Sequence, residues 1–312
     1  MTLRQLEVFV AITREQSFTL AARRIRLSQP TLSQHVQELE QELGKRLFLR
    51  SGRAVTLTDA GRAFQPYATR IVMMVGDARQ AVAEVDGLTH GSLSIGASTT
   101  PGIYVLPGVV GEFHERYPGV DVKLRIANSR AIEDAVRAND VDLGVVGGHG
   151  LAPGEECLAA GLLDELVLIV PPNHPWAGRR TVAPSMLARQ RLLAREEGSA
   201  TQGVAQRALQ RANVPFTVAM ELDHPEAVKQ AVMAGLGVAF MSVHAIRGEV
   251  ESGRLRAIRV QGVRIQRHFH VIHHEARTLN AGARAFLQSL ERARLGRYGL
   301  HGKRGGSRPR LG

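Results

Sequence analysis

Residues 17–48, SFTLAARRIRLSQPTLSQHVQELEQELGKRLF, constrain the fold of this chain more than any other stretch. They contain two helical patterns that are separated only by the turn RLS, residues 26–28. Ser17 can cap the first helix. We expect this helix to pack through Leu20, Ala21 and Ile25. Together with the apolar pattern of residues 3–14, the stretch predicts three short helices at the start of the chain.

The second helix of this pair has a well-formed apolar face. Ser28 is a suitable N-cap, and Gly44 can terminate the helix. Pro30 falls in the first turn, where a missing N–H has little effect. Apolar side chains recur at spacings of four, three and four residues and form one face: Leu32, Val36, Leu39 and Leu43. We expect this face to hold the helix on its scaffold.

The polar start of the same helix predicts contact with DNA. Gln side chains can pair with adenine edges, and Thr offers a hydroxyl and a methyl group to thymine. A helix that presents such groups after a tight turn is typical of the recognition helix of a helix-turn-helix. The alternative is a surface helix of an ordinary helical bundle. The predicted DNA contacts are Ser28, Gln29, Pro30, Thr31, Ser33, Gln34 and Gln37.

A β-hairpin is predicted directly after this helix. The strand-like runs RLFLR and AVTLT flank the turn SGR, residues 51–53. Arg50 and Arg53 lie near the expected tip, where the wing of a winged helix-turn-helix contacts the DNA backbone or the minor groove. Arginines on a solvated hairpin are the alternative. After a predicted recognition helix, we favour the DNA role.

Beyond the hairpin, a long helix and then a different pattern are expected. Apolar residues at heptad-like spacing predict a coiled-coil-like seam, which Pro66 is expected to kink: Phe64, Ile71, Val75, Ala78, Val82 and Val85. The segment GLTHGS, residues 87–92, is expected to be a hinge. Strand-like runs then alternate with helical patterns, which indicates doubly wound α/β sheets. The runs are residues 92–98, 120–127, 141–148, 165–172, 216–222, 237–242 and 267–274.

The chain resembles the LysR-type transcriptional regulators. The matching motifs are LRQLEVFVAI, residues 17–48, R-x-x-R-x-V-x-LTDAG and LP-x-V-V-x-x-F-x-x-x-YPGV, and the likeness extends to about residue 293. It implies an N-terminal all-α winged helix-turn-helix with a long linker helix, and a C-terminal α/β two-lobed effector domain like the periplasmic binding proteins. The expected domains are residues 1–58, a dimerisation helix at 59–88 and an effector domain at 91–293. Lobe I covers about 91–162 and 267–293, and lobe II covers 163–262.

The same resemblance implies partners. We expect a dimer through the linker helix that assembles further into a homotetramer, and contact with RNA polymerase. The expected DNA is a double-stranded interrupted inverted repeat, because a two-fold protein reads a two-fold site.

Three segments at strand ends are candidates for binding an effector of unknown identity. They are GASTTPG, GGHG and REEGSATQG, and similar regulators contact effectors through the first and third. Hydroxyls and backbone N–H groups would make an uncharged site for a small anion. Ordinary N-capping is the alternative for each residue. The candidates are Ser98, Thr99, Thr100, His149, Ser199 and Thr201, and Asp223 and His224 could add polarity to the cleft.

Charge and cysteine content indicate a cytoplasmic protein. The formal net charge is +11, and the Gly/Arg-rich residues 301–312 contain four basic residues and no acid. We expect the tail from residue 294 onward to be disordered, either solvated or in weak contact with nucleic acid. Cys157 is the only cysteine, which fits a reducing compartment. Charged residues within the first twenty exclude a signal peptide, and no apolar run is long enough to span a membrane.

No enzyme motif is present, and we expect no catalytic residues, cofactor or metal. The chain lacks G-x-S-x-G, G-x-x-x-x-G-K-[ST], H-E-x-x-H and G-x-G-x-x-G. His268 and His270 share a face in a strand that also holds His273 and His274, but no nearby cysteine or acidic trio completes a metal site. A solute-binding protein is the main rival for the second half. The N-terminal DNA-binding pattern argues against it.

Overall fold

The computed structural model describes residues 1–51, 54–83, 91–148, 155–275 and 277–296. The chain divides into two compact units, each described here by itself. The first comprises Met1–Val85 with Ala276–Asn280, and the second comprises Asp86–Glu275 with Ala281–Gly312. No helix among the described residues is long and apolar enough to cross a membrane.

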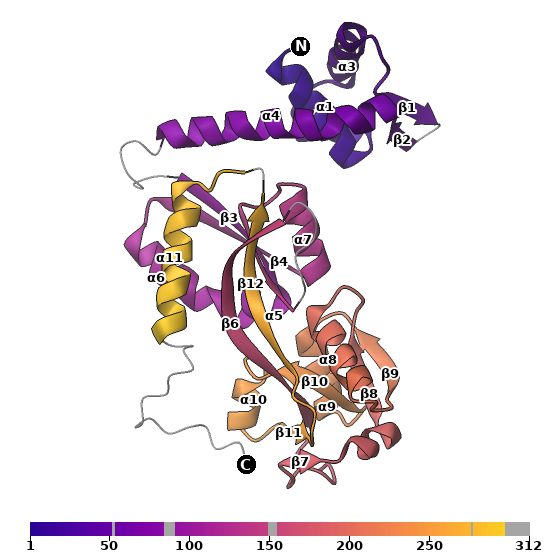
Figure 1. Ribbon diagram of the computed structural model, residues 1–312, viewed down its shortest axis with the longest axis vertical. Helices are drawn as coiled ribbons and strands as arrows, with labels where there is room; N and C mark the ends of the chain where they lie inside the picture. The colour runs from indigo at the N-terminus through magenta and orange to yellow at the C-terminus, as the bar shows by residue number, and fades with distance from the viewer. Residues whose placement is uncertain (52–53, 84–90, 149–154, 276, 297–312) are drawn as a thin grey trace. The chain divides into compact units, whose positions relative to one another are not determined.

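The first unit consists of helices followed by a hairpin and one long helix (Figure 1). Its elements are α1 (Leu3–Glu15), α2 (Phe18–Arg24), α3 (Gln29–Leu43), β1 (Phe48–Ser51), β2 (Ala54–Leu57) and α4 (Asp59–Ala83). Aromatic rings join these elements, because Phe9 of α1 lies 5.2 Å from Phe48 of β1 and 5.1 Å from Phe64 of α4 between ring centroids. This aromatic cluster anchors the hairpin and the first turns of α4 to the three-helix scaffold.

Two apolar positions differ from the expected packing of the first unit. Leu20 of α2 is 49% exposed, and Phe18 is buried in its place together with Ala21 and Ala22. Leu43 is 37% exposed because it lies in the last turn of α3, beyond the scaffold contacts of Leu39. In α2, the buried face passes through residues 18, 21 and 22, so Leu20 points away from it.

The second unit consists of two lobes, and lobe I contains a five-stranded sheet. The strand order is β4 (Val120–Ala127), β3 (Gly91–Ser98), β5 (Leu143–Gly147), β12 (Gln266–His274) and the first part of β6 (Glu155–Val170). β3 pairs in parallel with β4 and β5, whereas β12 runs antiparallel to β5 and β6. Its helices are α5 (Thr99–Tyr104), α6 (Leu106–Arg116), α7 (Ser129–Arg137) and α11 (Ala281–Gly296).

Lobe II is built on the second part of β6. The strand order continues with β10 (Val238–Ser242), β8 (Arg191–Arg195) and β9 (Thr217–Leu222), while β11 (Arg256–Val260) pairs with β6 and with β7 (Thr181–Val182). The helices are α8 (Ala200–Arg211), α9 (Pro225–Met233), α10 (Arg247–Glu251) and a 3-10 turn at Pro184–Arg189. Apolar side chains of β6, β10 and α8 form the lobe core, including Leu168, Phe240 and Leu209.

Strand β6 is the feature that the sequence pattern underestimates. Only its second half is an obvious apolar run, yet the strand continues over 16 residues and contributes to both sheets. Three short strands were also absent from the predicted set: β7, β8 and β11. Helix α11 reaches Gly296, three residues into the expected tail, and residues 297–312 lie outside the described part of the chain. The end of the predicted linker helix, residues 84–88, also lies outside it.

Candidate functional site

The start of α3 presents its polar side chains to solvent. The Ser28 hydroxyl accepts a hydrogen bond from the backbone N–H of Thr31 at 3.2 Å and lies 2.7 Å from the Thr31 hydroxyl. This N-cap holds the first turn in place. The predicted DNA contacts Ser28, Gln29, Pro30, Thr31, Gln34 and Gln37 are exposed, and Ser33 is half-buried. They are therefore available on one end of the helix, as the sequence predicts.

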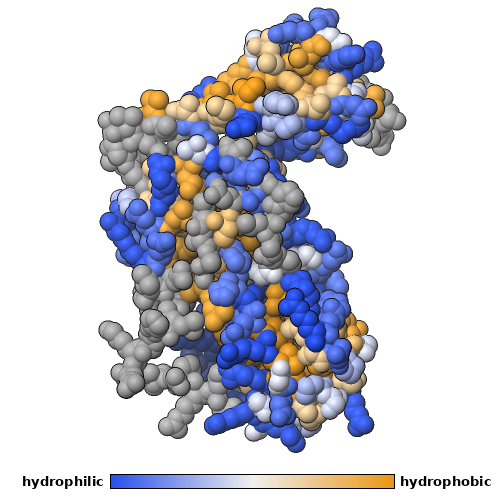
Figure 2. Space-filling model, in the orientation of Figure 1, coloured by the Kyte–Doolittle hydropathy of each residue, from blue (hydrophilic) through white to orange (hydrophobic). Residues whose placement is uncertain are grey.

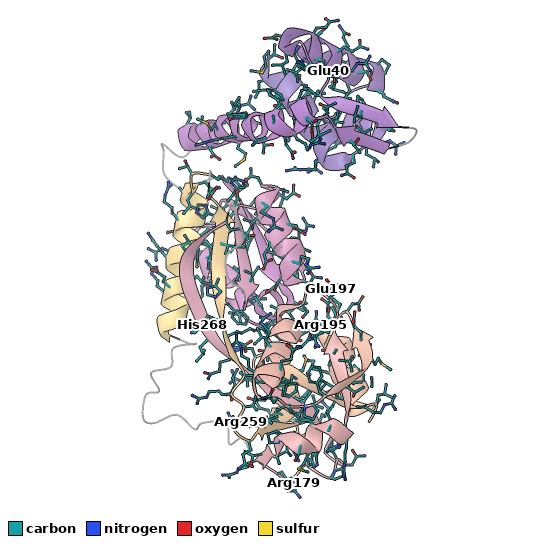
Figure 3. The ribbon with its side chains drawn as sticks, turned by 45° about the vertical axis from the view of Figure 1, so that its right-hand side comes forward. Glu40, Arg179, Arg195, Glu197, Arg259 and His268 are labelled. Atoms are coloured by element: carbon teal, nitrogen blue, oxygen red, sulfur yellow. The ribbon has the colours of Figure 1, made fainter. Side chains whose placement is uncertain are left out.

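Glu40 connects α3 to the hairpin. Its carboxylate accepts hydrogen bonds from the backbone N–H groups of Leu47 at 2.7 Å and Phe48 at 3.2 Å (Figure 3). The hairpin itself is in the expected register, with Arg50 of β1 opposite Val55 of β2. Arg53 lies outside the described residues. One carboxylate of α3 thus holds the start of the hairpin against this helix.

In the second unit, Ser98 and Ser199 occupy N-cap positions without acting as caps. Neither side chain makes a capping hydrogen bond to its helix, α5 or α8. Both residues are buried, as are Thr100 and Thr201. Ordinary capping therefore does not explain these two serines. His149 lies outside the described residues.

Two buried arginines, which no sequence pattern indicated, lie beside the predicted hydroxyls. Arg195 at the end of β8 is 4% exposed and donates a hydrogen bond to the Thr99 hydroxyl at 3.3 Å. Arg267 on β12 is 6% exposed and donates to the Thr100 hydroxyl at 3.2 Å. The guanidinium of Arg195 thereby joins lobe II to α5 of lobe I.

Carboxylates accompany both guanidiniums. Arg195 donates to both oxygens of Glu196, at 2.8 and 3.1 Å, and to the carbonyl oxygen of Asp223 at 3.3 Å. Arg267 donates to Asp164 at 2.8 Å, and Asp164 also accepts a 2.6 Å hydrogen bond from the Ser242 hydroxyl. The Asp223 side chain is not the group that Arg195 contacts. His224 caps α9 by accepting from the backbone N–H of Glu226.

The electrostatics of the two arginines are coupled. Burial lowers the pKa of Arg267, Asp164 opposes this change, and the positive charge of Arg195 lowers the pKa further. The two guanidiniums are therefore close enough to influence each other. The expectation of a site without permanent charge was wrong, because fixed cations stand next to the hydroxyls. Arg195 opens the REEGSATQG segment and could have been found there, whereas Arg267 gave no signal within its histidine-rich strand.

Further polar contacts cross between the lobes next to this cluster. Arg130 of α7 pairs with Glu197 at 2.9 Å, and its backbone N–H donates to the carbonyl of Gly198 at 3.3 Å. In Figure 3, Arg195 and Glu197 lie at the end of lobe II that faces lobe I. A cavity of about 320 Å³ lies beside these contacts, and its charged lining residues are Arg130, Glu133, Glu196, Glu197 and Arg207. Ser199 also lines it, whereas Arg195 and Arg267 do not. A small molecule at this position would contact both lobes.

The histidine-rich strand brings two imidazole rings near one another and near the thiol of Cys157. His268 is exposed and His270 is half-buried, with 6.5 Å between their ring centroids. The Cys157 sulfur lies 3.8 Å from Nδ1 of His270. Burial, and then the charge of His268, lower the pKa of His270. Over the described ranges, no three or more His, Cys, Asp or Glu side chains are grouped as a metal site requires.

Comparison with known proteins agrees with this architecture. Residues 3–62 match the model of the bacterial regulatory helix-turn-helix proteins of the lysR family, and residues 86–294 match the LysR substrate binding domain. A RuBisCO operon transcriptional regulator of Allochromatium vinosum is 34% identical over 299 residues, which covers 95% of this chain and 98% of that protein.

Solved structures show the same fold. A cysteine-to-aspartate variant of full-length OxyR from Pseudomonas aeruginosa has a TM-score of 0.74 at 22% identity and covers 97% of this chain and 99% of its own. The regulatory domain of CcmR from Synechocystis PCC6803, solved in complex with 2-PG, has a TM-score of 0.61 at 28% identity. It covers 65% of this chain and 97% of its own. The winged helix-turn-helix and the two-lobed effector domain are thus confirmed, and the solute-binding alternative is disfavoured. The chain belongs to the LysR family of DNA-binding transcriptional regulators.

Proposed function

We propose that this regulator controls a RuBisCO operon in response to a small anionic effector that binds between the two lobes. The operon assignment is supported by the relatives that carry this name, such as the Allochromatium vinosum regulator. The effector assignment is carried by one observation: Arg195 and Arg267 are buried beside the hydroxyls of Thr99 and Thr100. Guanidinium groups of this kind bind carboxylates and phosphates through two parallel hydrogen bonds.

The chemistry of the site favours a ligand with a phosphate or carboxylate group. Glu196 and Asp164 each accept hydrogen bonds from one of the two arginines, so an anionic ligand would share these guanidiniums with them. The other donors are the hydroxyls of Ser98 and Ser199 and the backbone N–H groups that begin α8. A phosphate at the start of α8 would gain from the helix dipole as well. The 2-PG ligand of CcmR supports this class of effector. His149 and Thr201 stay secondary candidates.

On DNA, the exposed start of α3 is proposed to read the operator. The residues Gln29, Thr31 and Gln34 carry the base-edge contacts, and Arg50 and Arg53 of the hairpin contact the backbone. The amide of Gln34 also donates to Glu38 at 3.0 Å, so binding to a base has to replace that hydrogen bond. Gln29 is therefore the better single test of recognition.

Helix α4 is proposed to pair with its counterpart in a dimer. Four large apolar side chains on it are exposed: Tyr67 (69%), Ile71 (37%), Met74 (59%) and Val82 (75%). Figure 2 shows apolar residues along the visible side of this helix. The expected seam needs correction, because Phe64 packs inside the first unit instead. Further assembly into a tetramer, and contact with RNA polymerase, are proposed from the family resemblance.

The DNA proposal is tested by fluorescence anisotropy with the operator and with competitor DNA. Replacing Gln29 by Ala should weaken operator binding by about 1–3 kcal/mol and leave competitor binding nearly unchanged. Gln41→Ala is the matched control, since Gln41 is an exposed glutamine near the other end of α3. Full discrimination by the Gln29 variant would contradict the recognition assignment.

The effector proposal is tested by calorimetry on the full chain. The panel comprises inorganic phosphate, glycolate, 2-phosphoglycolate and 2-phosphoglycerate, the last two sharing the abbreviation 2-PG. Arg195→Gln should lower the affinity for the tightest-binding ligand of the panel at least tenfold. Arg179 is an exposed arginine at the far end of lobe II in Figure 3, and Arg179→Gln should leave this affinity unchanged. Normal binding by the Arg195 variant would place the effector elsewhere.

A further inference from the structure

We infer that the effector domain has a second anion site, outside the cleft of Arg195 and Thr99, for a small ligand that carries two phosphoryl groups. The site is a cavity of about 270 Å³ at the junction of α8, the end of β5 and the start of β12. Four arginines line it: Arg207, Arg211, Arg264 and Arg267. No Asp or Glu occurs among the described residues that line it. The existence of this site does not depend on the proposed effector or operon, whereas its coupling to the cleft rests on the proposed function.

One wall of this arginine pocket is a single face of α8. Val204, Arg207, Ala208 and Arg211 recur at spacings of three, one and three residues, and all four line the cavity. The guanidinium of Arg207 donates a hydrogen bond to the carbonyl of Gly148 at 3.1 Å. This bond fixes one cation at the junction between lobe II and the end of β5.

The opposite wall is formed by backbone and by the residues that lead into β12. Gly148 has a φ of +80°, and a Cβ there would lie 2.6 Å from Cγ2 of Val204 and 3.5 Å from Cδ of Arg267. Glycine thus permits the end of β5 to approach α8 closely. Arg264 is exposed, whereas Arg267 is buried and directs its guanidinium to Asp164 and Thr100. Arg267 therefore lines the arginine pocket, and its guanidinium donates a hydrogen bond to Thr100 of the proposed effector cleft.

The charge of the pocket indicates the class of ligand. Asp164 is bonded to Arg267, and the neighbouring Glu165 is engaged by Arg259 at 2.7 and 3.0 Å. Among the described residues, no carboxylate lines the pocket beside the guanidiniums of Arg207, Arg211 and Arg264. The carboxylates nearby are Glu165, whose pKa is lowered by Arg259 and then by Arg264, and the glutamates of the neighbouring cavity that Arg207 also lines. A phosphoryl group carries about 1.5 to 2 negative charges at neutral pH. Two such groups balance three guanidiniums better than one does, and each can accept two parallel hydrogen bonds.

A ligand in the arginine pocket would also act on the effector cleft. It would contact α8 of lobe II, the end of β5 in lobe I, and the segment from Arg264 to Arg267. Binding would favour the lobe arrangement in which these three elements adjoin, and Arg267 takes part in both sites. Occupancy of one site should therefore change affinity at the other, and the change is reciprocal.

The experiment is calorimetry on the full chain with inorganic pyrophosphate, carried out in the Arg195→Gln variant so that the effector cleft is weakened. The test variant adds Arg211→Gln and Arg264→Gln, both at exposed positions. The matched control adds Arg179→Gln and Arg247→Gln instead, which removes the same charge from exposed positions outside the pocket. Circular dichroism checks that each variant is folded. We expect at least a tenfold loss of pyrophosphate affinity in the test variant and less than twofold in the control.

Further arms identify the source of the two phosphoryl groups. Fructose 1,6-bisphosphate and ADP represent sugar bisphosphates and nucleotides, and inorganic phosphate should bind at least tenfold more weakly than pyrophosphate. Failure of pyrophosphate to bind overturns the inference, as does an equal loss in the control. So does the disappearance of binding with Arg195→Gln alone, which would place the ligand in the cleft. The variant with Arg211→Gln and Arg264→Gln is also tested for binding to non-specific duplex DNA. If its affinity for this DNA falls as much as its affinity for pyrophosphate, the surface is a DNA contact and the inference is wrong.

Discussion

A Cβ atom on Gly61 would lie 2.2 Å from the carbonyl oxygen of Leu47. This contact brings the first turn of α4 directly against the residue that precedes β1. Thr58 reinforces it, because its backbone N–H donates to the carbonyl of Leu47 at 2.9 Å and its hydroxyl donates to the carbonyl of Arg46 at 2.6 Å. The hydroxyl also accepts from the N–H of Gly61 at 2.9 Å. The LTDAG motif therefore has a steric explanation: only glycine fits where the helix starts against the wing.

Gly61→Ala should destabilise the first unit by about 1–3 kcal/mol, because the clash involves backbone and cannot be relieved by a rotamer change. Gly76→Ala is the matched control on the same helix, since a Cβ there meets nothing within 4 Å. It should be neutral, or stabilising by about 0.4–1 kcal/mol. Amide hydrogen exchange of residues 1–51 in the full chain measures both changes. Equal protection in the two variants would show that the start of α4 relaxes freely.

Glu40→Ala should loosen the wing. The substitution leaves the N–H groups of Leu47 and Phe48 without their acceptor, and we expect a loss of about 1–3 kcal/mol in the stability of the first unit. Glu40→Gln keeps one acceptor oxygen and should recover part of this loss. Hydrogen exchange at residues 47–49 and operator affinity are the measurements. If both variants match the wild type, the carboxylate does not position the hairpin.

Local patterns predicted the DNA-binding unit in detail because its elements are short and adjoining in sequence. The cap at Ser28, the buried face of Leu32, Val36 and Leu39, and the hairpin were all recognisable from spacing. The prediction that Leu20 is buried was wrong. Spacing alone does not decide this position, since a short helix can place either Phe18 or Leu20 on its buried side. Only the neighbouring rings decide, and Phe18 lies 5.9 Å from Phe48 between centroids.

The proposed effector cleft was only partly predictable because its charged members come from distant parts of the chain. Thr99 and Arg195 are separated by 96 residues, and Thr100 and Arg267 by 167. Strand ends and small hydroxyl residues made Ser98 and Ser199 candidates, but no local rule places Arg267, which lies on a strand, next to Thr100. The first half of β6 was missed for a related reason: it has no continuous apolar run, and its pairing with β12 fixes it as a strand.

Glu133 should make the effector domain less stable as the pH rises. Burial raises the pKa of this carboxyl, and the negative charge of Glu155 adds to the increase. The folded state therefore binds the proton more tightly than the unfolded chain, in which the pKa of a Glu carboxyl is about 4.3. The free energy of unfolding therefore falls as the pH rises from the unfolded-state pKa through the folded-state pKa. Glu133→Gln should raise the melting temperature at pH 7 and give no gain below pH 4. Glu115→Gln, at an exposed position, serves as the control.

The buried pair of Asp164 and Arg267 allows stability and ligand binding to be separated. Asp164 is 0% exposed and accepts from both Arg267 and Ser242. Asp164→Ala leaves the Arg267 guanidinium buried without its counter-ion, so we expect a loss of about 3–5 kcal/mol in the free energy of unfolding. Adding Arg267→Met removes the uncompensated charge and should restore much of that stability, because an apolar replacement of a buried pair is often neutral.

Ligand binding should respond differently to the same two variants. Since Arg267 donates to Thr100 in the cleft, the restored double variant should still bind the anionic effector at least tenfold more weakly than the wild type. Urea unfolding and calorimetry on the wild type, both single variants and the double variant complete the cycle. A double variant no more stable than Asp164→Ala alone would show that the charge of Arg267 is not what destabilises the single variant. A double variant that binds the effector normally would remove Arg267 from the cleft site and leave Arg195 as its only essential cation.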